Sequence, residues 1–264
     1  MKEFHTIPLS QIRATRLLAF EEATTEVIRV RNKLTMKEKP WNREYRDKEA
    51  YYDTFRPVLE CQEISSILRE MKKNKSPGEK LVVMDAMGTG SVFENLPQDA
   101  RPDTIIAMTL VDYRTKEKKD ADIKQGLYII GTDKDDVDQL STSVALPHTW
   151  IAFEKLLKEL GVKSIDFAVA RPLGGMHTIP AEYPWFLAWM AQKVYKHLNP
   201  SGGMLLTEAP QNQNTFLLQW SEQVRQRGLD VVCKLITKDR DFQPIRAALK
   251  IIKHPDSPVS LSQA

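Results

Sequence analysis

The chain has 264 residues, 42% of them hydrophobic and 28% charged, so it is long enough to bury a sizeable core and has the composition of an ordinary globular protein. Its net charge of +3 gives no dense basic patch, so nucleic-acid binding is not supported, and no stretch approaches the ~18 apolar residues that a membrane span needs. Two cysteines, Cys61 and Cys233, and five scattered histidines provide neither a disulfide framework nor metal-ligand spacing. We therefore expect a cytoplasmic protein without a metal site or a membrane partner.

Residues 1–78 are expected to form an N-terminal helical extension or lid. Apolar side chains recur every three or four positions over residues 9–36, which is typical of an amphipathic helix. Aromatic residues mixed with arginines over 41–56 either stack a ring or, more simply, pack a lid or an oligomer contact. A further helical face over 58–71 ends before a Ser-Pro-Gly turn. Because such helices have little core of their own, we expect them to cover a pocket mouth or to contact another subunit or a partner.

A buried strand that runs into a glycine turn is predicted at residues 80–91. The apolar run over 81–85 is followed by Ala86-Met87-Gly88-Thr89-Gly90. Glycine allows a positive φ and lets a ligand approach the main chain closely. A short helix expected at 91–96 would point its free N–H groups at the turn, which is the usual geometry for a nucleotide-like ligand. A glycine-rich connection without a ligand is the alternative.

Strand and helix patterns alternate over residues 79–254. Strands are expected at 81–85, 104–111, 127–131, 165–170, 203–208, 229–236 and 246–252, and helices near 91–96, 148–160, 182–198 and 214–227. The segment between Asp112 and Leu127 is interpreted as too short and too charged for an ordinary crossover helix. Alternation predicts an α/β fold with a Rossmann-like, seven-stranded, mostly parallel sheet, and the last two strands, with no helix between them, predict a C-terminal antiparallel hairpin. Residues 255–264 are expected to be a flexible tail.

Several segments between residues 80 and 253 are similar to motifs of one family, the class I S-adenosylmethionine-dependent methyltransferases. Met87-Gly88-Thr89-Gly90 resembles the second half of its glycine-rich motif, and Asp112 stands where that family has the acidic residue that binds the ribose hydroxyls. Gly131-Thr132-Asp133 resembles the segment that reaches the adenine amino group, and the turn over 198–206 resembles the entry to the fifth strand. The resemblance implies S-adenosylmethionine as the cofactor. The residues that it implies for binding are Asp85, Ala86, Met87, Gly88, Gly90, Asp112, Tyr113 and Asp133.

The glycine motif departs from the family pattern at two positions. When Gly88 and Gly90 are aligned, the usual acidic residue and first glycine fall on Met84 and Ala86. Asp85 is one position away, and one position on a strand reverses the direction of the side chain. These departures favour the alternative that the protein is a catalytically inactive methyltransferase-like fold that serves as a binding or interaction module.

The methyl acceptor is expected beside the loop that follows the fourth strand. Open α/β sheets bind ligands outside the carboxyl ends of their strands, and residues 171–185 follow such an end. There Arg171 would hold an anionic acceptor, His177 would act as a base and Tyr183 would wall the pocket, although a lone histidine in a loop is more often a surface or packing residue. The acceptor, a small molecule or a protein, is not identified by the sequence.

Other enzyme classes fit the sequence less well. A nicotinamide-dependent oxidoreductase needs Gly-x-Gly-x-x-Gly, and Phe93 stands at the third glycine. The chain has no Gly-x-Ser-x-Gly nucleophile elbow. The absence of Asn-Pro-Pro-aromatic after the fourth strand argues against methylation of a base amino group.

Overall fold

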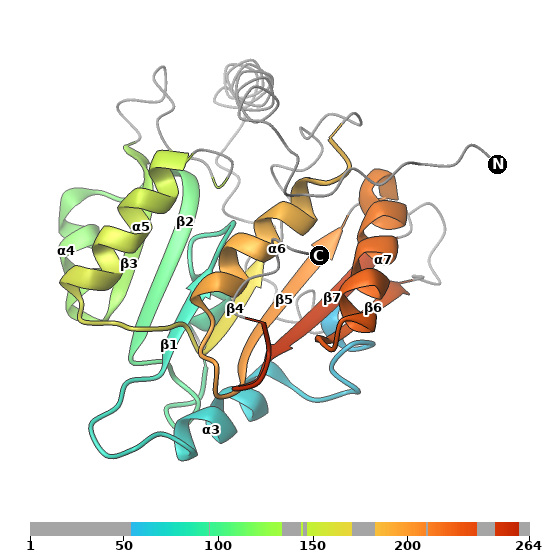
Figure 1. Cartoon of the computed structure of the whole chain (residues 1–264). Helices are drawn as coiled ribbons and strands as arrows, with labels where there is room; N and C mark the ends of the chain where they lie inside the picture. Colours follow the sequence, from blue (N-terminus) through green and yellow to red (C-terminus); the bar gives the residue numbers. More distant parts are fainter. Residues whose placement is uncertain are drawn as a thin grey trace.

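The computed structural model describes residues 54–94, 96–133, 144, 147–170, 183–209, 211–236 and 246–258. Within these ranges seven strands form a single sheet in the order β3-β2-β1-β4-β5-β7-β6 (Figure 1). The strands are β1 Val82–Asp85, β2 Thr104–Asp112, β3 Leu127–Asp133, β4 Phe167–Ala170, β5 Gly203–Ala209, β6 Asp230–Ile236 and β7 Arg246–Lys253. The expected helix at 9–36, the aromatic stretch up to residue 53 and the last six residues of the tail lie outside the described residues.

The sheet confirms the predicted fold class. Strands β1 to β5 pair in parallel, and β7 runs antiparallel to both β5 and β6. Each strand begins and ends within two residues of its predicted bounds. The strands could be predicted from their apolar runs because the strands of a parallel sheet are buried on both faces.

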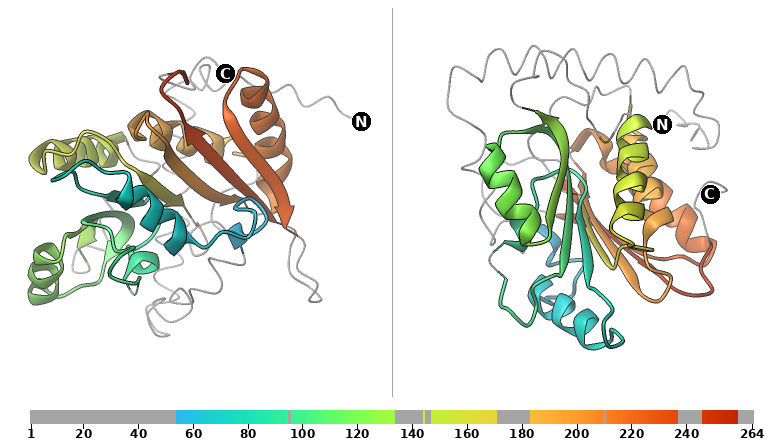
Figure 2. Two further views of the ribbon diagram at one scale, coloured as in Figure 1. Left: turned by 90° about the horizontal axis from the view of Figure 1, so that it is seen from below. Right: turned by 90° about the vertical axis from the view of Figure 1, so that its left-hand side faces the viewer.

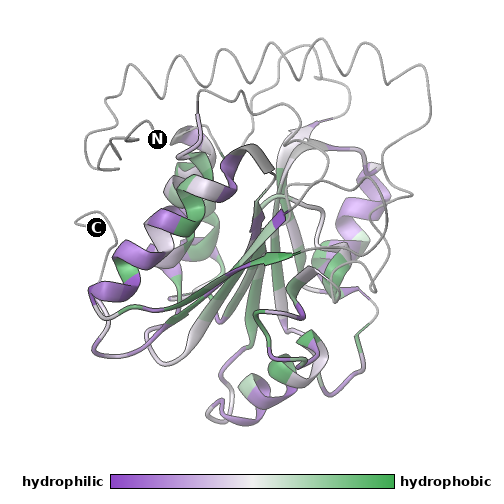
Figure 3. Ribbon diagram, turned by 90° about the vertical axis from the view of Figure 1, so that its right-hand side faces the viewer, coloured by the Kyte–Doolittle hydropathy of each residue, from purple (hydrophilic) through white to green (hydrophobic). Residues whose placement is uncertain are grey.

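Helices cover both faces of the sheet. On one face lie α5 Pro147–Glu159, α6 Phe186–His197 and α7 Gln211–Gln226, and on the other lie α3 Ile64–Lys73 and α4 Lys116–Lys124 (Figures 1 and 2). Right-handed crossovers explain this division, because the chain moves outward from β1 to β3 and then returns to build the sheet in the opposite direction. Coloured by hydropathy, the strands between the helices are largely apolar and the outer helix surfaces largely polar (Figure 3).

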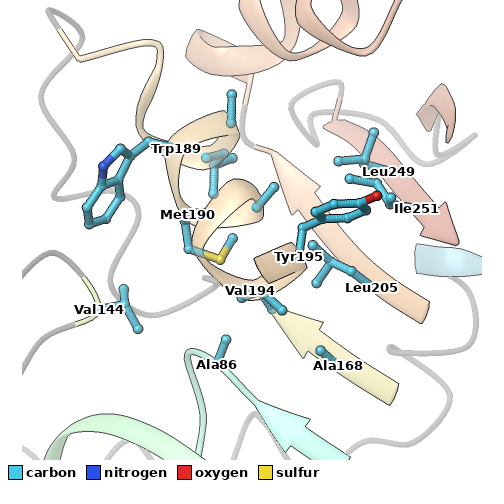
Figure 4. Packing of buried hydrophobic residues seen from close by; sticks show 14 of the residues in the cluster. Ala86, Val144, Ala168, Trp189, Met190, Val194, Tyr195, Leu205, Leu249 and Ile251 are labelled. Atoms are coloured by element: carbon cyan, nitrogen blue, oxygen red, sulfur yellow. The ribbon is translucent and has the colours of Figure 1, made fainter. Parts of the chain in front are cut away.

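Alternate residues of each strand supply two separate cores. In β1, Val82 and Met84 point towards α5, α6 and α7, whereas Val83 points towards α3. The larger cluster packs side chains of α6 such as Met190 against the sheet (Figure 4). The direction in which each strand residue points is therefore fixed by its register.

The described part of the N-terminal segment belongs to the second core. Phe55, Ile64 and Leu68 pack in one cluster with Val83 and Phe93, and Phe55 is fully buried. Lys234 on β6 also donates a hydrogen bond to the backbone carbonyl oxygen of Pro57 at 2.8 Å. Residues 54–71 thus complete the face of the sheet opposite α5, α6 and α7.

Two expectations about local structure need correction. The charged segment after Asp112 does form a helix, the nine-residue α4. Thr115 caps it by accepting the N–H of Lys118 at 3.3 Å, and Lys118 pairs with Asp122 one turn later at 2.7 Å. The expected helix at 91–96 is only a 3₁₀ turn, η3 Ser91–Phe93.

A polar junction lies at the amino edge of the sheet, centred on the buried Asp166. Its Oδ2 accepts the N–H of Val82 at 2.9 Å, and its Oδ1 accepts Nζ of Lys75 at 2.7 Å and Nδ2 of Asn199 at 2.8 Å. This single carboxylate therefore joins the start of β1, the segment after α3 and the turn before β5.

Candidate functional site

Asp85 lies beneath the glycine turn at the carboxyl end of β1. As the last residue of that strand it points to the same face as Val83, which is also the face of η3. The chain folds back over it at once, and the Gly90 N–H donates to Oδ2 at 2.9 Å. The one-position offset that we expected to turn Asp85 away from the turn instead places it inside, with 1% of its surface exposed.

The two glycines of the turn are required by packing within the chain. Gly90 has a φ of +80°, and a Cβ there would lie 2.9 Å from Leu127 Cδ1. A Cβ on Gly88 would lie 2.2 Å from Asp85 Oδ2, a separation that real Cβ atoms essentially never show. Residues 86–90 therefore close tightly over the Asp85 carboxylate.

The Asp85 carboxylate is electrostatically unusual. Burial raises its pKa to about 6, although hydrogen bonds from the N–H groups of Gly90 and Met87 oppose the rise. In the described part of the chain, Oδ1 of Asp85 is buried and has no hydrogen-bond partner. A buried carboxylate oxygen with an unused acceptor site, and a pKa close to neutrality, is a feature that clusters at functional sites.

Asp112 ends β2, the strand beside β1, and is held by Arg114. The guanidinium donates to both carboxylate oxygens, from Nε to Oδ1 at 2.9 Å and from Nη2 to Oδ2 at 3.0 Å, and the Arg114 N–H adds a third bond to Oδ1 at 3.1 Å. Only 6% of Asp112 is exposed. Arg114 also donates to Oδ2 of Asp122 in α4 at 2.9 Å, so α4 fixes the arginine in place.

Asp133 faces Asp112 across the β2–β3 pair. The register opposes the two carboxylates, after an irregularity in β2 between Met108 and Val111. Lys119 Nζ lies between them, 2.6 Å from Asp133 Oδ2 and 3.7 Å from Asp112 Oδ2. The carboxyl ends of β2 and β3 thus carry an alternating network of acidic and basic side chains.

The remaining predicted site residues are distributed along the same edge. Ala86 is buried, and its N–H donates to the Val169 carbonyl oxygen at 2.8 Å, while Met87 is partly buried against the larger core. Tyr113, next to Asp112, is 38% exposed. Tyr183 packs edge to face against Trp185 just before α6, with ring centroids 5.8 Å apart. Arg171 and His177 lie outside the described residues.

Two polar residues that the sequence analysis did not select also lie at this edge. Arg114 follows Asp112 by two positions, so an Asp-x-Arg spacing directly after a strand was the available signal. Gln213 lies on the buried face of α7 with Leu217 and Trp220, and the signal was a polar residue at a position where the helical period requires an apolar one.

Within the described residues there is no group of three or more histidine, cysteine or acidic side chains that would hold a metal ion. In the same part of the chain, no helix has the length and apolar character that crossing a membrane requires.

A sheet in the order β3-β2-β1-β4-β5-β7-β6, with β7 antiparallel to its neighbours and a glycine turn after β1, is the class I methyltransferase fold, and the chain has this fold. No family model matches the sequence, and neither does any curated protein.

Similar solved structures include several methyltransferases, all at low identity. The plantazolicin methyltransferase BpumL, solved in complex with SAH, is 9% identical over 90% of this chain and 98% of its own, with a TM-score of 0.40. The METTL16 methyltransferase domain is 13% identical over 72% of this chain and 66% of its own, with a TM-score of 0.42. The O-methyltransferase TomG from Streptomyces achromogenes, in complex with SAM, is 10% identical over 78% of this chain and 90% of its own, with a TM-score of 0.36.

Proposed function

We propose that this protein binds S-adenosylmethionine and transfers its methyl group to an acceptor. The observation that carries the proposal is Asp85, a buried carboxylate with one oxygen that no described residue hydrogen-bonds, enclosed by a glycine turn at the carboxyl edge of the first strand. Such an edge is where open α/β sheets bind nucleotide-like ligands. The adjoining strands add Asp112 and Asp133 at the same edge.

The described residues fit the groups of an adenosyl ligand. Oδ1 of Asp85, which has no partner among the described residues, can accept from a cationic or N–H donor group. The carboxylate of Asp112 can accept from a pair of ribose hydroxyls if they share it with Arg114. Asp133 and the exposed Tyr113 would flank the base, and the backbone of residues 86–90 would pack beside the rest. The ligand itself supplies an activated methyl group, so the protein has chiefly to hold and orient donor and acceptor.

For the acceptor side, we propose Tyr183 together with the sequence-predicted Arg171 and His177. Tyr183 and Trp185 precede α6, which begins near the carboxyl end of β4. If His177 removes a proton from the acceptor, His177→Ala lowers turnover by ~10²–10⁴ and leaves cofactor affinity unchanged. Arg171→Ala should raise the KM of an anionic acceptor in the same assay.

Calorimetric titration with S-adenosylmethionine and S-adenosylhomocysteine tests the proposal directly. We expect both to bind the full chain, and Asp112→Ala to weaken binding by about 1–3 kcal/mol through lost hydrogen bonds to a charged group. Asp99→Ala is the matched control, because Asp99 also pairs with an arginine, Arg69, but at an exposed site. Equal losses in both variants would remove Asp112 from the site.

The alternative is a methyltransferase-like fold without catalysis that acts as an interaction module. Two observations favour it. Arg114 already engages both oxygens of Asp112. Packing within the chain is by itself enough to explain the two glycines of the turn, Gly88 and Gly90. A folded protein that binds neither S-adenosylmethionine nor S-adenosylhomocysteine would contradict methyl transfer and favour this alternative. Residues 1–78 would then be the first surface to test for an oligomer or partner contact.

A further inference from the structure

Gln213 is a buried polar side chain whose hydrogen-bonding capacity is not used by any described residue. None of its surface is exposed, and within the described part of the chain neither Nε2 nor Oε1 has a hydrogen-bond partner. A carboxamide offers two N–H donors and a carbonyl acceptor, and leaving them unpaired in a protein interior costs free energy. A buried amide with both ends unpaired calls for a partner that the described residues do not provide.

The fold places this amide at the ligand-binding edge of the sheet. Helix α7 begins two residues after the end of β5, so its first turn, which contains Gln213, lies at the carboxyl edge. The helix α6 is its neighbour and also begins at that edge, just after Tyr183 and Trp185 (Figure 1). An aromatic pair and an unpaired carboxamide thus stand at the starts of two adjacent helices.

A second unpaired polar group lies on the same helix face. Trp220 follows Gln213 by seven residues, two turns and ~10 Å along the axis. Its indole Nε1 is buried and, among the described residues, has no acceptor. Leu217 lies between them and is fully buried, so the buried side of α7 mixes apolar side chains with polar ones, which also include Asn214 and Ser221.

We propose that Gln213 is a specificity-determining residue of the acceptor subsite, where it recognises a planar group that carries an N–H donor beside a carbonyl acceptor, as in a cyclic amide. Two antiparallel hydrogen bonds join such an edge to a carboxamide and satisfy both of its ends. A lactam ring and a nucleobase share this chemistry. The inference rests on the proposed methyl transfer, since that function makes this edge the acceptor side.

A pair of small probes tests the recognition chemistry. 2-Pyridone is a planar ring with adjacent N–H and C=O groups, and 1-methyl-2-pyridone keeps the ring and the carbonyl but lacks the donor. The full chain labelled with ¹⁵N is titrated with each, and the side-chain amide signal of Gln213 is assigned by its loss in Gln213→Met. We expect 2-pyridone to shift that signal and 1-methyl-2-pyridone to bind at least about tenfold more weakly. Equal binding of the two probes, or no shift at the solubility limit of 2-pyridone, overturns the proposal.

A stability measurement separates this role from a structural one. Gln213→Met keeps the length of the side chain and removes the unpaired amide, so we expect the ligand-free Tm to rise by about 2–4 °C while 2-pyridone binding is lost. Gln219→Met, at an exposed position of the same helix, should change neither. A lower Tm in Gln213→Met would mean that the amide is satisfied within the fold by water, which overturns the proposal. If this variant does not fold, the Gln213 amide signal is assigned from through-bond connections to its own backbone, and the titrations on the wild-type chain still decide the proposal.

The same samples distinguish the two proposals. S-adenosylhomocysteine is titrated into each of them by calorimetry. Binding of 2-pyridone without binding of S-adenosylhomocysteine would support the cyclic-amide subsite and contradict methyl transfer. The reverse result would support the cofactor site and remove Gln213 from the acceptor site.

Discussion

When it is ionised, the buried Asp85 destabilises the folded chain. Its pKa in the native state, about 6, is higher than the ordinary value of 3.8, so between these two pH values the native protein binds more protons than the unfolded chain. The free energy of unfolding therefore falls as pH rises through this window. A shift of two pKa units corresponds to a cost on the order of 3 kcal/mol above pH 6. At neutral pH the protein therefore contains an ionised buried group that lowers its own free energy of unfolding.

The first prediction is that Asp85→Asn stabilises the ligand-free protein at pH 7.5, because it removes the charge and retains an acceptor for the Gly90 N–H. The gain should shrink as pH falls from 6 to 3.8 and disappear only below about pH 3, where Asp85 is protonated in both states. Urea denaturation at several pH values measures it. A gain that is independent of pH would show that ionisation of Asp85 is not its source.

The second prediction concerns Gly88, whose missing Cβ leaves room for the Asp85 carboxylate. Gly88→Ala should destabilise the fold by about 1–3 kcal/mol through overpacking. In an Asp85→Ala background most of this cost should vanish, because the clashing atoms are gone. Gly161→Ala is the control: Gly161 has a φ of +64° and open space around its Cβ position, so its cost, about 1–2 kcal/mol, should be the same in both backgrounds. Costs that simply add for Gly88 would contradict the close contact.

At the scale of the element, α4 fixes the position of one arginine, Arg114. Its Asp122 and the strand residue Asp112 share the Arg114 guanidinium, and Lys119 from the same helix approaches both Asp112 and Asp133. A bidentate arginine competes with any other group that approaches Asp112. Helix and strand together therefore set how available that carboxylate is.

The third prediction is that Arg114→Met lowers stability and raises ligand affinity. Loss of a largely buried pair should cost about 1–3 kcal/mol, while S-adenosylhomocysteine should bind several-fold more tightly because Asp112 is released. Arg225→Met, which breaks an exposed pair with Glu222, should change neither by more than about 0.5 kcal/mol. Weaker binding in Arg114→Met would mean that the arginine helps to hold the ligand.

The sequence allowed the sheet to be predicted but not α4. Strands such as β5 are continuous apolar runs that are buried on both faces, and their signal is local. Helix α4 has no apolar stripe and is held by the Thr115 cap and by ion pairs, so a search for periodicity misses it.

Of the candidate site, Asp112 and the glycine turn could be located because they follow strands directly. The enclosure of Asp85, the pairing of Asp112 with Arg114 and the unpaired amide of Gln213 all depend on tertiary packing.

At the scale of the whole molecule, residues 54–71 and the sheet share one core. The fourth prediction is that Phe55→Ala lowers the free energy of unfolding by about 3–5 kcal/mol, which is a large part of the stability of a typical domain. Unfolding in urea should remain a single transition for the wild-type protein and for the variant, since the hydrophobic cluster includes side chains from residues 54–71 and from the strands. Ile151→Ala, at a site 66% exposed, is the control and should be nearly neutral. Two separate transitions would mean that the segment folds apart from the sheet.

The junction at Asp166 has a consequence for hydrogen exchange. The Val82 N–H donates to a side chain 84 residues further along the chain, so it becomes accessible to solvent only when β1 separates from the segment that contains Asp166. That separation also releases Lys75 and Asn199, which hold the segment after α3 and the turn before β5. The Val82 amide should consequently exchange with deuterium only through opening of the whole sheet, and its exchange rate in the native state reports on global unfolding without any denaturant.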